Sequence, residues 1–494
     1  MARIGLAVAK LALAAVLSGA FGSAAAQADL ADRPAAALQP RDHPEPGRQG
    51  ETLPGEANVL ARPYSVGVRI VGHSPLGGRS GNLIQAWSGT CSYVAQMGGL
   101  SPSGQVIHAA PGPTLGVAVI DVRNPAAPVV VRYLQDRGAV DAAETMHAVT
   151  VRGRAVLAAS TYGGVPGING PREGWLDIYD VSDCRNPRLA SEVRWPEPTH
   201  TITVSPNGRR VYGTVINPFS GEGGIQVMDI SDLAHPRFVG KFEVTRPDGT
   251  SFAFAPHEIS ISPDERRIYA GTIASRGGDL NQGIRIFPPN AQGLGPEAGG
   301  IYILDNTDLA VGRSDPKLRL VGTALHGGWH SAVQARIAGV PYLVGAGELG
   351  ACPASWPRIS TIADERHPRI VGQFQLVMNH RENCPPREGD EVATNGVKGR
   401  DGTASTHFND VDSATDTRLG LFPFMFAGLR IVDLRRPASP TEVAYFKPGD
   451  ACMSHVRYVP ENGNIWFACR DSGFWVIALT PQLRRSLHLP PVRQ

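Results

Sequence analysis

Residues 197–244 read EPTHTITVSPNGRRVYGTVINPFSGEGGIQVMDISDLAHPRFVGKFEV, and this stretch decides the fold. It contains four short runs rich in β-branched and aromatic residues, at 201–204, 210–215, 225–230 and 237–244. Pro206-Asn207-Gly208 separates the first two runs, since Asn and Gly accept the positive φ that a tight hairpin needs. We therefore expect a four-stranded sheet, with an apolar face that one sheet cannot bury by itself.

Further copies of this unit recur along the chain, and the third strand is the easiest to trace. It reads VAVID (117–121), LDIYD (176–180), IQVMD (225–229), IYILD (301–305) and LRIVD (429–433), with weaker copies RIST (358–361) and FWVIA (474–478). In four copies a proline follows the aspartate by seven residues: Pro128, Pro187, Pro236 and Pro440. The aspartate can accept hydrogen bonds from turn amides, and the proline fixes φ where the outer strand begins. Both residues are therefore interpreted as structural.

These strand-plus-aspartate runs, with their downstream proline and V-G or E-V strand, resemble the LVIVD-repeat family of extracytoplasmic β-propellers over roughly residues 64–480. The run PHEISISPDERRIY (256–269) also resembles the YVTN repeat. The resemblance implies an architecture and no single reaction. Counting the copies predicts an all-β, seven-bladed β-propeller whose first strands begin near residues 82, 147, 200, 257, 330, 407 and 455. The N-terminal strand at 64–72 is expected to close the last blade, which leaves the ring without an open edge.

The N-terminal segment predicts export. Residues 1–28 are interpreted as a signal peptide, because Arg3 and Lys10 precede an apolar run at 11–20 that is too short to span a membrane, and small residues follow it. Residues 29–63 are rich in Pro, Ala and charge and predict a flexible leader, followed by the propeller at 64–480 and a C-terminal tail at 481–494. We expect a secreted or periplasmic protein with no membrane association after cleavage.

Charge and cysteine content limit the partners and the compartment. A net charge of +2 gives no case for a nucleic-acid partner, so we expect a small-molecule, protein or glycan ligand. Six cysteines in an exported chain suggest disulfides. Cys352–Cys384 and Cys452–Cys469 are the favoured pairs because each lies within one repeat, and Cys91 and Cys184 are left either paired or free.

Histidine marks the start of the first strand in six of the seven predicted blades. These residues are His147, His200, His257, His330, His407 and His455, and blade one has Asn82 instead. The chain has only 14 histidines, so composition does not explain six in one position of the repeat. The first strands of a propeller line its axis, and we therefore expect a ring of imidazoles in the channel.

A confined ring of imidazoles should be mostly neutral, and neutral imidazole binds Cu, Fe and Zn. The six histidines are therefore predicted metal ligands, with Glu258 and Asp410 as candidate general bases or supporting residues. The alternative is that each histidine caps a strand and bonds the neighbouring blade or channel water. His326, Glu348 and Trp329 are further candidates near the channel.

Two functions remain open at this point. The first is a metal or ligand site at the mouth of the channel, with the possibility of a metal-dependent enzyme of unknown substrate. The second is a non-catalytic propeller that binds a protein or glycan through two long insertions, at 274–299 in blade four and 376–404 in blade five. No nucleophile elbow, phosphate-binding loop or dinucleotide fingerprint is present in the sequence.

Overall fold

A computed structural model describes most of the chain from Tyr64 onwards, within one compact unit that spans residues 39–494. The described ranges are 64–97, 112–163, 173–216, 223–252, 254–272, 274–276, 284–287, 300–325, 329–347, 356–376, 406–425, 427–448 and 450–492. The predicted signal peptide and leader lie outside them. No helix in these ranges is long and apolar enough to cross a membrane.

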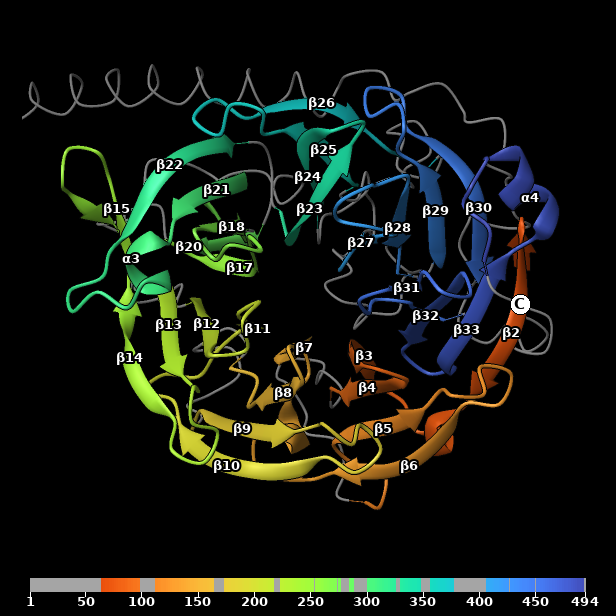
Figure 1. The fold of residues 1–494 in the computed structure, drawn as a ribbon, viewed down its shortest axis with the longest axis horizontal. Coiled ribbons are helices and arrows are strands. Elements are labelled where there is room, and N and C mark those ends of the chain that lie inside the picture. Colours follow the sequence, from red (N-terminus) through yellow and green to blue (C-terminus); the bar gives the residue numbers. More distant parts are fainter. Residues whose placement is uncertain are drawn as a thin grey trace, which may run out of the picture. The chain divides into compact units, whose positions relative to one another are not determined.

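Seven antiparallel sheets form the blades of a propeller, as the sequence predicted (Figure 1). Blades one to three consist of β3 (Asn82–Ser88), β4 (Cys91–Gln96), β5 (Val117–Asp121) and β6 (Val129–Leu134); β7 (Met146–Val151), β8 (Arg154–Ser160), β9 (Trp175–Asp180) and β10 (Arg188–Arg194); β11 (Ile202–Val204), β12 (Arg210–Ile216), β13 (Gly223–Asp229) and β14 (Arg237–Phe242). The strands of the opening stretch thus differ from their predicted bounds by two residues at most. In each blade the first strand lies nearest the axis (Figure 1).

The remaining blades follow the same order of strands. They consist of β17 (Pro256–Ile261), β18 (Arg267–Thr272), β21 (Gly300–Asp305) and β22 (Leu318–Leu325); β23 (Ser331–Ile337), β24 (Val340–Ala346), β25 (Arg358–Thr361) and β26 (Arg369–Gln373); β27 (Asp410–Val411), β28 (Leu419–Pro423), β29 (Leu429–Asp433) and β30 (Thr441–Lys447); and β31 (Arg457–Val459), β32 (Asn464–Cys469), β33 (Gly473–Leu479) and β2 (Val68–Ser74). Short additions are β1 (Tyr64–Val66), β15 (Val244–Thr245), β16 (Ser251–Phe252), β19 (Ala274–Arg276), β20 (Ile284–Phe287), the 3-10 helices η1 (Leu76–Gly78) and η2 (Ala139–Asp141), α3 (Thr307–Ala310) and α4 (Pro481–Ser486).

The N-terminal strand closes the last blade, with one refinement of the prediction. β2 pairs antiparallel with β33 and completes blade seven. The preceding β1 pairs instead with β30 of blade six. Gly67 lies between β1 and β2 with φ +72°, a conformation that glycine adopts without steric cost. The first described residues therefore tie two neighbouring blades together.

An apolar core lies between each pair of neighbouring blades. Blades one and two share a cluster around Tyr93 and Leu157, and blades seven and one share another around Val94 and Trp466. Equivalent clusters join the other five pairs of neighbouring blades. Because each sheet buries both faces against neighbours, the ring is stable where a single sheet is not.

The repeated aspartates close turns, as predicted. In each case one carboxylate oxygen accepts a hydrogen bond from the backbone N–H two residues later, at 2.8–3.0 Å, in Asp121, Asp180, Asp229, Asp305 and Asp433. This contact fixes the turn between the third and fourth strands.

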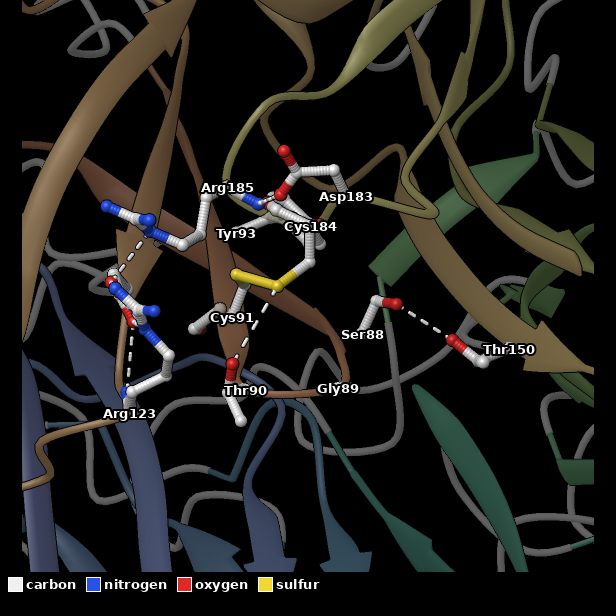
Figure 2. Close-up of a disulfide and its surroundings, with 12 residues drawn as sticks. Ser88, Gly89, Thr90, Cys91, Tyr93, Arg123, Thr150, Asp183, Cys184 and Arg185 are labelled. Atoms are coloured by element: carbon white, nitrogen blue, oxygen red, sulfur yellow. Dashed lines mark hydrogen bonds and ion pairs between the residues drawn. A yellow bond between two sulfur atoms is a disulfide. The ribbon is translucent and has the colours of Figure 1, made fainter. Parts of the chain in front are cut away.

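Two disulfides lie in the described ranges. Cys452–Cys469 confirms the predicted pair. Cys91 of β4 is bonded to Cys184, which lies in the turn after β9, so this bridge joins blade one to blade two (Figure 2). Cys352 and Cys384 lie outside the described residues.

Candidate metal centre

Five buried side chains from five consecutive blades converge at the start of the first strands. They are Glu144 before β7, His200 before β11, His257 on β17, His330 before β23 and His407 before β27, and each is at most 6% exposed. We call this set the His–Glu cluster. The structure thus brings together four of the six predicted histidines and adds a carboxylate that sequence reasoning missed.

Glu144 contacts all four imidazoles. Its Oε2 lies 3.7 Å from Nε2 of both His257 and His330. The same oxygen lies 3.9 Å from His200 Nε2, and Oε1 lies 3.5 Å from His407 Nε2. The Nε2 atoms of His200 and His257 are 2.7 Å apart, so one ring donates a hydrogen bond to the other. Ligand atoms of Glu144, His257 and His330 all lie within 4.8 Å of one another, so these three side chains form the part of the cluster that could hold one metal ion.

Strand register explains which residues reach the cluster. In blade three, Asp229 at the end of the third strand pairs with Arg210 of the second strand. The Arg210 carbonyl accepts from the Ser205 N–H, and His200 lies five positions before Ser205. In blades four, five and six, we followed the same pairing from the end of the third strand to the first strand and then went back five positions. The residues reached are His257, His330 and His407. One position of the repeat therefore supplies all four histidines.

In blade two the same count ends at Glu144 and not at His147. Asp180 pairs with Val156, and Val156 pairs with Val149. Glu144 lies five positions before Val149. Counting back from the turn would have identified this carboxylate from sequence, whereas a search for repeated histidines passes over it.

His455 is also displaced from that position, by one residue. Ala478 of the third strand pairs with Asn464, and Asn464 pairs with Val459. The count from Val459 ends at Ser454. The sequence-based alignment of six histidines in one register therefore needs correction for His147 and His455.

The cluster combines one carboxylate with imidazoles, and the pKa values of Glu144, His257 and His330 are all lowered. Burial raises the pKa of Glu144, but His407 and then His257 and His200 outweigh it and lower the pKa to about 2. Burial lowers the pKa values of His257 and His330 well below the usual value, and neighbouring imidazoles lower them further. Among the described residues, no donor lies within hydrogen-bond distance of Glu144 Oε2. A buried carboxylate oxygen in this state is costly unless a cation compensates it.

Blades one and seven contribute no side chain to the His–Glu cluster. His407 Nδ1 donates to the Met453 carbonyl at 2.9 Å, which leaves its Nε2 directed at Glu144. On this side lies a group of buried apolar residues, with Met97 packed against it: Leu83, Ala143, Tyr162, Met425, Ala451 and Met453. Leu83 is the residue that the register count reaches in blade one. The side of the His–Glu cluster that faces blades one and seven therefore contacts apolar side chains.

His455 lies in a second group of charges. Its Nε2 is 3.1 Å from Glu258 Oε1, and its Nδ1 is 3.1 Å from Asp410 Oδ2. Burial lowers the pKa of His455, but the two carboxylates outweigh it and raise the pKa to about 10. The Phe408 ring separates this group from the His–Glu cluster, with centroids 4.4 Å from His455 and 4.5 Å from His407.

His147 has a structural contact. The Val204 N–H of the neighbouring blade donates to its Nδ1 at 3.2 Å. Burial, followed by the charge of His455, lowers the pKa of His147 to about 4. This contact agrees with the alternative hypothesis, in which the histidine forms a hydrogen bond with the neighbouring blade.

The other candidates are structural or lie outside the described residues. Trp329 is fully buried in the core between blades four and five. Asn82 accepts from Arg79 Nε at 2.7 Å and donates to the Arg470 carbonyl at 3.0 Å. His326 and Glu348 are outside the described ranges.

A repeat-family match agrees with the fold. Residues 220–244 match the model of the LVIVD repeat, which covers the third and fourth strands of blade three. No curated protein matched. Among solved structures, Kuenenia stuttgartiensis hydrazine synthase is similar with a TM-score of 0.46 and 12% identity, over 81% of this chain and 96% of that one. A chain of the mitotic checkpoint complex has a TM-score of 0.46 and 9% identity, over 84% of this chain and 95% of its own. Similarity at this level says nothing about function.

Proposed function

We propose that this LVIVD-repeat β-propeller binds one transition-metal ion at the His–Glu cluster of its axis. The observation that carries the proposal is that ligand atoms of Glu144, His257 and His330 lie within 4.8 Å of one another, with His200 and His407 in contact with the same carboxylate. Imidazole favours Zn, Cu and Fe, so these are the ions expected. Such an ion would supply Lewis-acid chemistry or, as Cu or Fe, redox chemistry.

The protein residues have separate roles in this proposal. Glu144 supplies the negative charge that balances the cation. The hydrogen bond from His407 Nδ1 to the Met453 carbonyl orients that ring, as is usual for ligating histidines. The buried apolar side chains of Leu83, Tyr162 and Met453 beside the His–Glu cluster keep water from that side of it. We propose no ligand role for His147 and His455, because their nitrogens bond other groups.

Metal analysis of the purified protein tests the proposal. We expect about one Cu, Fe or Zn per chain in the wild type and little in His330→Ala or Glu144→Gln. His235→Ala is the matched control, because His235 is an 82% exposed side chain on the rim, paired with Asp232. Its metal content should equal that of the wild type.

A second measurement separates metal loss from misfolding. Chelation of the wild-type protein should lower its melting temperature, and added metal should restore it. A ligand at about 100 times its dissociation constant contributes about 2.7 kcal/mol. Wild-type protein with no stoichiometric metal, and no stabilisation by any of the three ions, would overturn the proposal.

We also propose that the protein is exported. The two disulfides of the described residues fit an oxidising compartment, and the predicted signal peptide supplies the route. The alternative function, capture of a protein or glycan by the insertions at 274–299 and 376–404, stays a prediction, because most of those residues lie outside the described ranges.

A further inference from the structure

A second feature of the axis is a cavity of about 370 Å³, lined by residues of all seven blades. The innermost strands β3, β7, β11, β17, β23 and β27 contribute to it, together with His455 just before β31 (Figure 1). This volume lies within the range of small-molecule sites. None of the five residues of the His–Glu cluster lines the cavity.

Two carboxyl groups and one histidine form the polar end of the lining. Glu258, Asp410 and His455 all line the cavity. Because both ring nitrogens of His455 lie 3.1 Å from a carboxylate oxygen, both donate, and the ring is an imidazolium. The two carboxylates flank this ring, and Glu258 Oε2 is buried with no hydrogen-bond donor in reach among the described residues. The fourth ionisable residue in the lining, His147, accepts at Nδ1 from a backbone N–H and is neutral.

The hydroxyl groups of the lining also favour a ligand that donates hydrogen bonds. Thr203 Oγ1 donates to the Ile259 carbonyl at 2.9 Å, and Ser260 Oγ donates to the Ala332 carbonyl at 2.7 Å. Each hydroxyl has one proton, so only its lone pairs remain for a ligand.

The rest of the wall is mostly apolar. It includes Trp87, Val149, Val204, Ile261 and Val333 from five different blades. An aromatic face attracts a cation as well as apolar groups. Outside the lining, the guanidinium of Arg457 lies 5.9 Å from the Trp87 ring and donates to the Gly89 carbonyl. Its charge weakens the field of the carboxylates at that wall without cancelling the charge within the lining.

We propose that the cavity binds a small organic cation, namely an apolar body that carries one ammonium group. The ammonium group lies against the Glu258–His455–Asp410 end, and the apolar body lies against the aliphatic and tryptophan walls. The site is distinct from the His–Glu cluster, because the Phe408 ring lies between them. The proposal does not depend on the presence of a metal ion.

Calorimetry with three probes of one shape tests the charge preference. The probes are 2-phenylethylammonium, 2-phenylethanol and 3-phenylpropionate, with the wild-type protein. We expect the ammonium probe to bind about tenfold or more tightly than the alcohol, because it adds a charge-assisted hydrogen bond. The carboxylate should bind least. Equal binding of ammonium and alcohol, or no binding of the ammonium probe at about 10 mM, a concentration that detects even weak sites, overturns the proposal.

Two variants place the binding in the cavity. Val333→Phe fills the cavity and should abolish binding, whereas Val340→Phe, the same change at a 37% exposed residue of the same blade, should not. Asp410→Asn keeps an acceptor for the Val456 N–H and should remove the preference for the ammonium probe. Metal content is measured in each variant. An unchanged affinity in folded Val333→Phe, or an unchanged preference in Asp410→Asn, also overturns the proposal.

Discussion

Replacing Asp177 with asparagine should stabilise the protein above neutral pH and leave it nearly unchanged in acid. Asp177 lies on β9, fully buried and directly opposite Glu192 of β10. Burial, together with the charges of Glu192 and Asp136, raises its pKa to about 7, against the effect of the hydrogen bond from the Ala139 N–H. Like charges opposite each other on neighbouring strands are unfavourable, so the ionised form is penalised in the folded state.

The magnitude follows from the size of the shift. A carboxyl whose pKa is raised on folding binds its proton more tightly in the folded state, so its ionisation costs stability as pH rises. The cost is absent below about pH 4 and complete above about pH 7, and a shift of about three units corresponds to about 4 kcal/mol. The asparagine keeps a carbonyl acceptor for the Ala139 N–H. The variant should therefore gain up to about 4 kcal/mol at pH 8.

Thermal unfolding of both proteins from pH 4 to pH 8.5 measures this. For a chain of this size, the gain amounts to several degrees at pH 8, at roughly 2 °C or less per kcal/mol. Glu192→Gln should reproduce part of the effect by removing the opposing charge. Asp416→Asn, at a 69% exposed side chain, is the matched control and should change little at any pH. A change independent of pH in Asp177→Asn, or a loss of stability at pH 8, would refute the reasoning.

Two further changes test the packing around the candidate metal centre and between the blades. In Gly345→Ala the new Cβ would lie 1.7 Å from the buried Trp329 ring, so we expect the free energy of unfolding to fall by about 3 kcal/mol or more. Because His330 is adjacent to Trp329, the metal content should fall as well. Thermal melts and metal analysis measure the two effects, and wild-type values for both would contradict the packing argument. The double variant Cys91→Ser, Cys184→Ser removes a disulfide between residues 93 positions apart, and its free energy of unfolding should be lower by roughly 2–5 kcal/mol. A melting temperature equal to that of the oxidised wild type would contradict the stabilising role of this disulfide.

The fold was predictable because its signals are local. Each repeat carries its own turn residues, and Asp229 accepts from the backbone two residues later whatever the rest of the chain does. The pairing of Cys452 with Cys469 was predictable for the same reason, because both residues lie in one repeat. The bridge from Cys91 to Cys184 was not, because only the placement of blade two against blade one brings these residues together.

The candidate site was predictable in part. His200, His257, His330 and His407 share one position of the repeat, and sequence periodicity located them correctly. Periodicity also suggested His147 and His455, which the structure places in other hydrogen bonds. It passed over Glu144, because a glutamate three residues before a histidine does not resemble the pattern sought.

Sequence alone determined that this protein has seven blades and that its histidines lie near the axis. Tertiary structure decided which side chains meet there, because strand register depends on the length of each hairpin. Val151 pairs with Arg154 across a two-residue turn in blade two, whereas Ser205 bonds Arg210 across four residues in blade three. Blade five has the same two-residue turn as blade two, between Ile337 and Val340, and its corresponding position is His330. Hairpin length therefore sets which position of each first strand reaches the cluster, and pairing across the sheets shows that Glu144 occupies this position in blade two.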